Sequence, residues 1–379
     1  MSTIPSASRN IPTSYKLIPA LWRVTRDNEF LEDLSEFIVS GRVSFNPDRS
    51  IKWQFEAEID QAARIKPYVD FISPRLTIEH EDGSSETSSY GVYLTVPPKK
   101  SISNTEQFIT LDSRDLTYIL ANDGFDDGYT RSAGQNIVQT VRALLEEAGF
   151  SRHQIADHPA LLEDTKSWGA NTSRLEVINE LLNSINFYTL YMTKDGYVAS
   201  RPYVGDRDKA ASISYSTNPP SKVQVVSSPI KHETTPDRIA NRIIVIGGTP
   251  PDNVIIGRAI NNSPSSPTST VNLGMTITKK YEGVQVADQE SANLIAQQYL
   301  DIASQEYNRL NIKTFPDLSV GPYDVYRLDI RNTVGEAVAE GTWNQRGFEV
   351  SFTTPDGNGL MTHELSNIDD PAMNMEGGA

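Results

Sequence analysis

Apolar and polar residues alternate without interruption between residues 51 and 60, in the sequence IKWQFEAEID. A period of two is typical of a β-strand that buries one face and exposes the other. The predicted buried face consists of Ile51, Trp53, Phe55, Ala57 and Ile59. The predicted exposed face consists of Lys52, Gln54, Glu56, Glu58 and Asp60. Because three of these five residues are acidic, the strand raises the question of what its charged face meets.

The surrounding sequence, residues 17–112, shows further strand patterns. Asp-Gly pairs between alternating segments favour hairpins, and Asn-Pro-Asp favours chain reversal. The predicted strands are 37–45, 75–80 and 90–96, and the predicted turns are 46–48 and 81–83. Several short strands at this spacing predict a small barrel or sandwich.

Residues 113–205 have a different pattern. Apolar residues recur at helical spacing over 136–148, and a second helix is predicted to begin at Asn171-Thr172-Ser173, which are competent N-caps. The segments 187–193 and 197–203 flank an Asp-Gly pair and predict a hairpin. The sequence therefore predicts a compact α+β unit in the middle of the chain.

Strand patterns return over residues 206–365, among them the predicted strands 337–345 and 348–353, and one long helix near 288–308 with Asp288 as its N-cap interrupts them. Gly247-Gly248 follows a strand pattern and predicts a turn, because no helix can begin at the Thr-Pro-Pro that comes next. The polar, Pro- and Ser-rich segment 261–270 predicts a loose, mobile loop.

The two ends of the chain have no periodic pattern. Residues 1–16 predict a flexible arm and residues 366–379 a flexible tail. The fold class predicted from the whole pattern is mainly β with an α+β insertion. A faint similarity between Gly91–Thr95 and Gly347–Thr353 suggests that the two strand-rich blocks are related.

The amino-acid composition argues against several classes of function. The chain has 379 residues and a formal net charge of −15, which argues against nonspecific binding to DNA or to an anionic membrane. It contains no cysteine, so disulfides, zinc–thiolate clusters and thiol nucleophiles are excluded. The N-terminal residues do not resemble a secretory signal, and no apolar run reaches the ~20 residues of a membrane helix. We expect a soluble protein made in the cytoplasm.

The sequence contains little that indicates catalysis. No Gly-Lys pair exists for a phosphate loop, and the acidic segment 122–128 is best explained as a turn. His153, Asp157 and His158 form a local cluster, but a spacing of five does not place two imidazoles on one helix face. A hydrolase of cell-envelope polymer acting through His153, Asp157 or nearby acids is the main alternative function. A glycan-binding β module is the other.

Taken in order, several segments resemble the baseplate hub and tail-associated proteins of bacteriophages. The resemblance runs from about residue 20 to 355, and each motif is degenerate, so it rests on their order and spacing. The segments that carry it are SFNPDRSIKWQFEAEID, RLTIEHEDGSSETSSYGVYLTVPP, ITLDSRDLTYIL, NIVQTVRALLEEAGF, SRLEVINELLNSINFYTLYMTKDGYVASRPY and FPDLSVGPYDVYRL.

The resemblance implies a fold and a set of partners. Residues 17–112 and 206–365 are expected to form two β-barrels of tail-tube type that flank the α+β unit. Three subunits would form a ring that adapts the sixfold tail tube to a threefold tip at the distal end of the tail and leaves a channel for DNA. The expected partners are further copies of the chain, the distal tail ring protein, the C-terminus of the tape-measure protein and a central fibre or tip protein. Neither a cofactor, a metal nor a catalytic site is expected.

The chain ends about twenty-five residues after its last predicted strand, so any lytic or receptor-binding activity is expected in another protein. The resemblance also suggests an answer for the strand at residues 51–60. Its acidic residues Glu56, Glu58 and Asp60 would line the channel and repel the phosphate backbone of passing DNA. The simpler interpretation, that these residues face bulk solvent or a neighbouring subunit, stays open because alternation alone does not distinguish the two.

Overall fold

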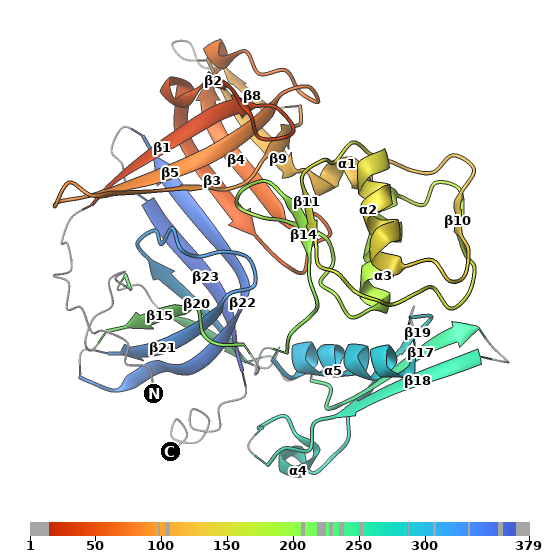
Figure 1. The fold of residues 1–379 in the computed structure, drawn as a ribbon. Helices are drawn as coiled ribbons and strands as arrows, with labels where there is room; N and C mark the ends of the chain where they lie inside the picture. The colour runs from red at the N-terminus through yellow and green to blue at the C-terminus, as the bar shows by residue number, and fades with distance from the viewer. Residues whose placement is uncertain are drawn as a thin grey trace.

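The computed structural model describes residues 15–97, 99–102, 107–205, 209–217, 225–226, 230–234, 239–249, 253–264, 266–284, 286, 288–305, 308–332, 334–354 and 359–368. Strands dominate these residues and helices are few, so the predicted mainly β class is confirmed (Figure 1). The closure of the strands into two barrels stays a prediction.

The N-terminal block consists of strands and two short 3-10 helices. These elements are β1 (Tyr15–Val24), β2 (Phe30–Asp33), η1 (Ser35–Phe37), β3 (Ile38–Phe45), β4 (Trp53–Asp60), η2 (Gln61–Ala63), β5 (Phe71–His80), β6 (Ser85–Ser89), β7 (Tyr93–Thr95), β8 (Lys99–Ile102) and β9 (Gln107–Asp115).

The middle unit mixes helices with short strands. They are α1 (Thr117–Ala121), β10 (Tyr129–Arg131), α2 (Ile137–Glu147), β11 (His153–Ile155), β12 (Lys166–Trp168), α3 (Arg174–Ser184), β13 (Tyr191–Met192) and β14 (Val198–Ser200). Asn136 caps α2 and Ser173 caps α3 with a complete capping box, so both predicted helix starts are confirmed. The predicted hairpin is confirmed as the antiparallel pair β13–β14.

The last part of the chain contains a second group of strands and a smaller module. The strands are β15 (Ile213–Ser216), β16 (Lys231–Thr234), β20 (Asn308–Thr314), β21 (Val325–Arg331), β22 (Ala337–Thr353) and β23 (Gly359–Asn367). The module consists of β17 (Arg242–Thr249), β18 (Asn253–Ile260), α4 (Thr270–Leu273), β19 (Thr278–Glu282) and α5 (Gln289–Gln305). The module has its own hydrophobic core, in which α5 packs on β17 and β18 (Figure 1).

One large sheet joins the two ends of the chain. Its strand order is β16-β20-β23-β22-β3-β4-β9-β7-β5-β1-β2. The N-terminal and C-terminal groups of strands meet where β3 pairs antiparallel with β22, from Phe45 opposite Phe348 to Ser40 opposite Thr353. We call this pairing the seam. Aromatic rings reinforce it, since the centroid of the Phe348 ring lies 5.8 Å from that of Phe45 and 5.4 Å from that of Trp53.

The predicted alternation is confirmed over the whole of β4, from Trp53 to Asp60. It fails at the residue just before the strand. Lys52 was expected on the exposed face but is only 3% exposed. Its Nζ donates to Thr189 Oγ1 at 2.7 Å and to the Leu190 carbonyl at 3.2 Å. The lysine therefore reaches from the N-terminal block into the middle unit, a long-range contact that the strand pattern does not reveal.

The predicted flexible ends are partly wrong. Tyr15 and Lys16 belong to β1, and Ser366 and Asn367 complete β23, because both pairs continue the hydrogen-bonding ladders of the large sheet. The rest of the predicted arm, residues 1–14, and of the tail, residues 369–379, lie outside the described residues.

Three local predictions for the last part of the chain are also wrong. Gly247 and Gly248 lie inside β17 rather than at a turn, and a Cβ at 247 would lie 2.5 Å from the Val284 carbonyl oxygen. The predicted strands 337–345 and 348–353 are one strand, β22, with an irregular register between Gln345 and Gly347. Segment 261–270 was expected to be loose, but its Ser266 is fully buried and its hydroxyl accepts a 2.7 Å hydrogen bond from Asn261 Nδ2.

A histidine lies in the core of the C-terminal strands. His363 is fully buried on β23, with its Nε2 2.9 Å from Thr314 Oγ1 and its Nδ1 3.2 Å from the Tyr326 hydroxyl. Burial lowers the pKa of His363 to about 3, so the folded protein holds it neutral at pH values at which an unfolded histidine is charged.

We predict that His363 makes the protein acid-sensitive. The folded pKa lies below the unfolded value of about 6.5, so the stabilisation is complete above pH ~6.5 and is lost as the pH falls toward 3. The free energy of unfolding should fall by about 1.4 kcal/mol per pH unit more steeply in wild type than in His363→Gln. Denaturant unfolding between pH 4 and 7 measures the slopes. His158→Gln, at a half-buried position, is the control, and equal slopes in wild type and His363→Gln would contradict the prediction.

Candidate functional site

The large sheet has a polar face that runs across the seam. On β9, β4, β3, β22, β23 and β20, one set of alternate residues is buried and the other is half-buried or exposed. The outward set includes Thr110 and Asp112 on β9, Gln54, Glu56 and Glu58 on β4, Ser40, Arg42 and Ser44 on β3, Glu349, Ser351 and Thr353 on β22, Thr362 and Glu364 on β23, and Asn311 and Lys313 on β20. The registers place these residues side by side, so both strand-rich groups contribute to one continuous polar face.

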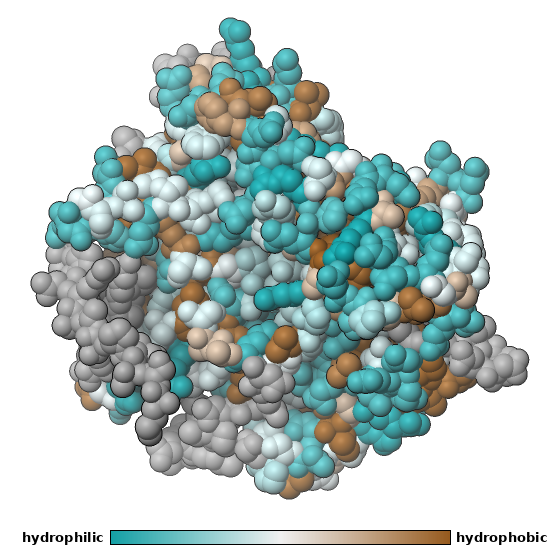
Figure 2. Space-filling model, in the orientation of Figure 1, coloured by the Kyte–Doolittle hydropathy of each residue, from teal (hydrophilic) through white to brown (hydrophobic). Residues whose placement is uncertain are grey.

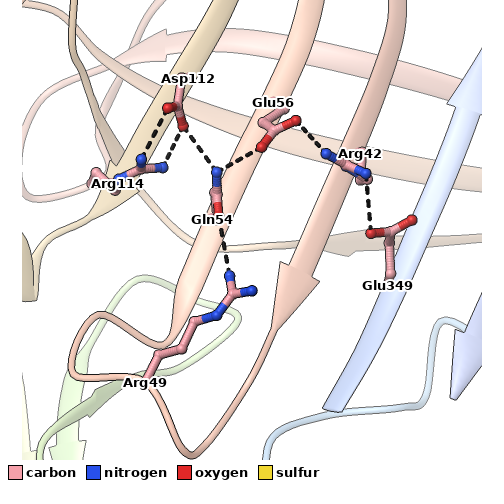
Figure 3. A network of polar contacts seen from close by, with 7 residues as sticks. All are labelled: Arg42, Arg49, Gln54, Glu56, Asp112, Arg114 and Glu349. Atoms are coloured by element: carbon pink, nitrogen blue, oxygen red, sulfur yellow. Dashed lines mark hydrogen bonds and ion pairs between the residues drawn. The ribbon is translucent and has the colours of Figure 1, made fainter. Parts of the chain in front are cut away.

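A chain of charged contacts crosses this face (Figure 3). Arg42 of β3 pairs with Glu56 of β4, and its Nη1 lies 3.6 Å from Glu349 Oε2 on β22. A single arginine therefore links three adjacent strands and spans the seam. The hydrogen bond to Glu56 raises the pKa of Arg42, which keeps the guanidinium charged.

The chain of contacts continues toward β9 through an amide. Gln54 Nε2 donates to Glu56 Oε1 at 2.6 Å and to Asp112 Oδ1 at 3.0 Å. Asp112 in turn pairs with Arg114, and Arg49 Nη1 donates to Gln54 Oε1 at 3.2 Å. The seven residues in Figure 3 contain three arginines and three carboxylates, so the network is formally neutral.

A depression of about 400 Å³ lies beside this network and follows the seam. It is lined mainly by polar and charged side chains, with two rings of the seam beneath them. The lining residues are Arg42, Ser44, Phe45, Asn46, Arg49, Gln54, Glu56, Phe348, Glu349, Thr362 and Glu364. Of the charged residues in this lining, Arg42, Glu56 and Glu349 are paired with one another.

The three predicted acidic residues have different surroundings. Glu56 lies within the network and is neutralised by Arg42. Asp60 caps the short helix η2, because its Oδ1 accepts from the Ala62 N–H at 2.8 Å. Within the described part of the chain, Glu58 has no ion pair or hydrogen bond to another side chain, although it shares the face with Glu56. Only Glu58 thus presents the free carboxylate that the sequence suggested.

Sequence reasoning missed the basic half of this face. Arg42 and Arg114 occupy outward positions on strands of the expected alternation, so the pattern could have placed them on exposed faces. Which strand lies beside β4 could not be read from it, because β22 comes from the other end of the chain.

The histidine cluster that supported a hydrolase is dispersed. His153 Nε2 lies 3.5 Å from Glu146, Asp157 accepts from Arg142 at 2.7 Å, and the His158 ring packs edge-on against Phe187. Each side chain therefore has a separate structural contact, and the three do not form one constellation. Among the described residues, no group of three or more His, Asp or Glu side chains is arranged to hold a metal ion. Those residues also include no helix long and apolar enough to cross a membrane.

The fold is similar to that of phage tail proteins. The tail protein from Neisseria meningitidis MC58 has a TM-score of 0.65 and 10% identity, over 94% of this chain and 98% of that chain. The 43 kDa tail protein of prophage MuSo2 from Shewanella oneidensis has a TM-score of 0.60 and 11% identity, over 94% and 99% of the two chains.

A third similar structure belongs to a secretion system. It is an E. coli component of the type VI secretion system, described as similar to the T4 bacteriophage tail proteins gp27 and gp5. Its TM-score is 0.50 with 9% identity, over 87% of this chain and 73% of that chain. No protein-family model and no curated protein sequence matches the chain. The predicted resemblance to tail and baseplate proteins is thus confirmed by the fold.

We predict that Arg42 stabilises the seam by a modest amount. Arg42→Gln removes the only positive charge between Glu56 and Glu349 in the network, so the two carboxylates lose their shared partner. Because Arg42 is half-exposed, the expected loss in the free energy of unfolding is only about 0.5–1 kcal/mol. Urea unfolding at low salt measures it, and the difference should shrink in 1 M NaCl.

Arg327→Gln, at an exposed position on β21, is the matched control, and its stability should change less. An Arg42→Gln variant as stable as wild type at low salt would show that the network does not contribute to the seam.

Proposed function

We propose that the chain is a structural tail hub: three copies form a ring that adapts a sixfold tail tube to a threefold tip and leaves a channel for DNA. The observation that carries the proposal is the continuous polar face that spans both strand-rich groups. The similarity of the fold to phage tail proteins supports the same assignment. We propose a structural rather than a catalytic role.

The topology of the polar face supports assembly by strand pairing. Beyond the strands that carry it, β16 pairs with β20 at one end and β8 pairs with β9 at the other. Among the described residues, neither β8 nor β16 has a strand on its second side. Unpaired strand edges are templates for pairing with another chain. In the proposed ring, β8 of one copy lies beside β16 of the next, and the polar faces join into the wall of the channel.

The symmetry follows from the two groups of strands. Each copy contributes an N-terminal and a C-terminal group that meet at the seam, and three copies contribute six such groups. A ring with threefold chemical symmetry can therefore match a tube of six subunits. In this proposal residues 17–112 and 206–365 form the two tube-type domains and residues 113–205 lie outside the channel.

The proposed position determines the partners. At the distal end of the tail in the virion, the ring would contact the distal tail ring protein on one side and a central fibre or tip protein on the other. The C-terminus of the tape-measure protein would enter the channel before DNA does. None of these contacts requires a cofactor.

The hypothesis that acidic residues line the channel is kept here in a modified form. Glu56, Glu58 and Asp60 would face the channel together with arginines that balance much of their charge. Paired charges give the wall little net attraction for a phosphate backbone, so DNA slides past without binding. Glu58 supplies local repulsion.

The proposed ring predicts that the protein forms a trimer in solution. Light scattering of the purified chain over a concentration series should give a mass approaching three times 42.0 kDa, and class-averaged images should show a central hole. Adding purified tail tube protein should promote the ring if the free chain associates weakly. A monomer or dimer under both conditions would refute the trimeric hub.

If the polar face is the channel wall, a change of charge on it should alter the rate of DNA ejection, and the same change elsewhere should not. Glu58→Lys places a positive charge in each copy on the polar face, where it should attract phosphates. In virions that carry the substitution, DNA ejection triggered in vitro should slow several-fold at low salt and recover as salt rises.

Glu290→Lys, at an exposed position on α5 away from the polar face, makes the same change of charge. It should leave the ejection rate unchanged. Equal rates for both variants and wild type would count against the polar face as the channel wall, while a trimer with a hole would still support the hub.

A further inference from the structure

The three-stranded sheet of the small module has two apolar faces, and helix α5 covers one of them. The strand order of this sheet is β18-β17-β19. Ile243 and Val245 of β17 and Ala259 of β18 lie in the core that the sheet forms with α5. The residues between them are largely apolar as well, in the strand sequences RIIVIGGT and NVIIGRAI. Continuous apolar runs are typical of strands that are buried on both faces.

The second face of this sheet is open within the chain. The register places Ile246 opposite Ile256, and both side chains point away from α5. Val254 is 44% exposed and Ile260 49%, and Figure 2 shows hydrophobic surface over the outer part of the β17–β18 hairpin. We call this surface the open face. Its aliphatic residues, which belong to no hydrophobic cluster among the described residues, are Ile244, Ile246, Val254, Ile256 and Ile260.

Positive charges flank these aliphatic residues. Arg258 of β18 and Lys280 of β19 lie on either side of Ile244, because both are in register with it. Arg242 adds a third cation and Glu282 one carboxylate, so three positive charges and one negative charge give the described part of the face an excess of two positive charges. Within the described part of the chain, none of the three cations has an ion pair.

A contiguous exposed aliphatic surface is typical of a protein–protein contact. We propose that the open face binds an amphipathic helix of a partner protein, with the apolar stripe of that helix on the isoleucines and acidic residues on its flanks. The face is about 20 Å long from Val254 to Ile260, which matches a helix of about 13 residues. Acidic side chains on the two flanks would meet Arg258 and Lys280. The bound helix would cover the second face as α5 covers the first.

A second copy of the chain fits the open face less well. Symmetric pairing of two open faces would bring together three cations from each copy, and like charges in an interface oppose association. The helices α2, α3 and α5 already bury their apolar stripes in the chain's own cores. The inference does not depend on the proposed ring, in which β8 of one copy lies beside β16 of the next.

Two synthetic helical peptides of about 18 residues test this chemistry. Both carry the same leucine stripe, and the flanks of one carry glutamates and those of the other lysines. Fluorescence anisotropy with the full chain at low salt should show the glutamate peptide binding about tenfold more tightly, and the advantage should shrink in 1 M NaCl. Because the net charge of the chain is −15, nonspecific attraction favours the lysine peptide, so the expected order distinguishes the open face from the rest of the surface.

Substitutions locate the binding. Ile256→Gln should weaken the glutamate peptide about fivefold, whereas Leu31→Gln, at an exposed apolar position on β2, should change nothing. Arg258→Gln should reduce the preference for the glutamate peptide to about threefold, and Arg327→Gln on β21 is its matched control. Thermal unfolding curves show whether each variant folds. If Ile256→Gln does not fold, Ile260→Gln at its half-exposed position replaces it.

Three results would overturn the proposal: neither peptide binds, the lysine peptide binds as tightly as the glutamate peptide, or Ile256→Gln and Leu31→Gln have equal effects. A change in the solution mass of the protein on Ile256→Gln would overturn it in favour of a second copy on the open face. The proposed ring is tested separately, because a monomeric wild type would refute the ring and leave peptide binding unaffected.

Discussion

The pairing of β3 with β22 is the contact on which the positions of the other elements depend. It joins strands from opposite ends of the chain and turns two groups of strands into one sheet. Gly41 of β3 belongs to this fit, because a Cβ there would lie 2.3 Å from the Phe352 ring of β22. Without the seam the polar face would divide into two separate surfaces, and the depression along it would not exist.

Directional contacts of two lysines, the buried Lys52 and the half-buried Lys194, then fix the middle unit. Lys52 extends from the N-terminal strands to the Leu190 carbonyl, and Lys194 extends from the middle unit to the carbonyls of Leu318 and Val320. Burial lowers the pKa of each lysine to about 8, so each ammonium is held at a cost in desolvation. An apolar replacement would leave the carbonyls without donors. Such contacts define the orientation of the middle unit relative to the strands more sharply than apolar packing does.

The sequence predicted what local interactions determine. The alternation of β4, the caps Asn136 and Ser173 and the hairpin at β13–β14 are formed by residues close together in the chain, and all are present. The errors arise where distant residues meet. Lys52 is buried because the middle unit covers it, and β17, which contains Gly247, also pairs with the distant strand β19. The candidate site follows the same rule: its acidic strand was visible in the sequence, but the bridge that Arg42 forms to β22 was not.

The balance of charge on the polar face changes the physical basis of the proposed channel. The whole chain has a charge of −15, yet the network that crosses the seam contains equal numbers of arginines and carboxylates. A wall of purely acidic strands would repel DNA, but it would also repel itself when three copies close into a ring. Pairing Glu56 and Glu349 with Arg42, which lies on the strand between them, removes part of that self-repulsion and reinforces the sheet at the same contacts. The pairing therefore reconciles an acidic protein with a closed assembly, and it leaves only isolated carboxylates such as Glu58 to discourage binding of phosphate.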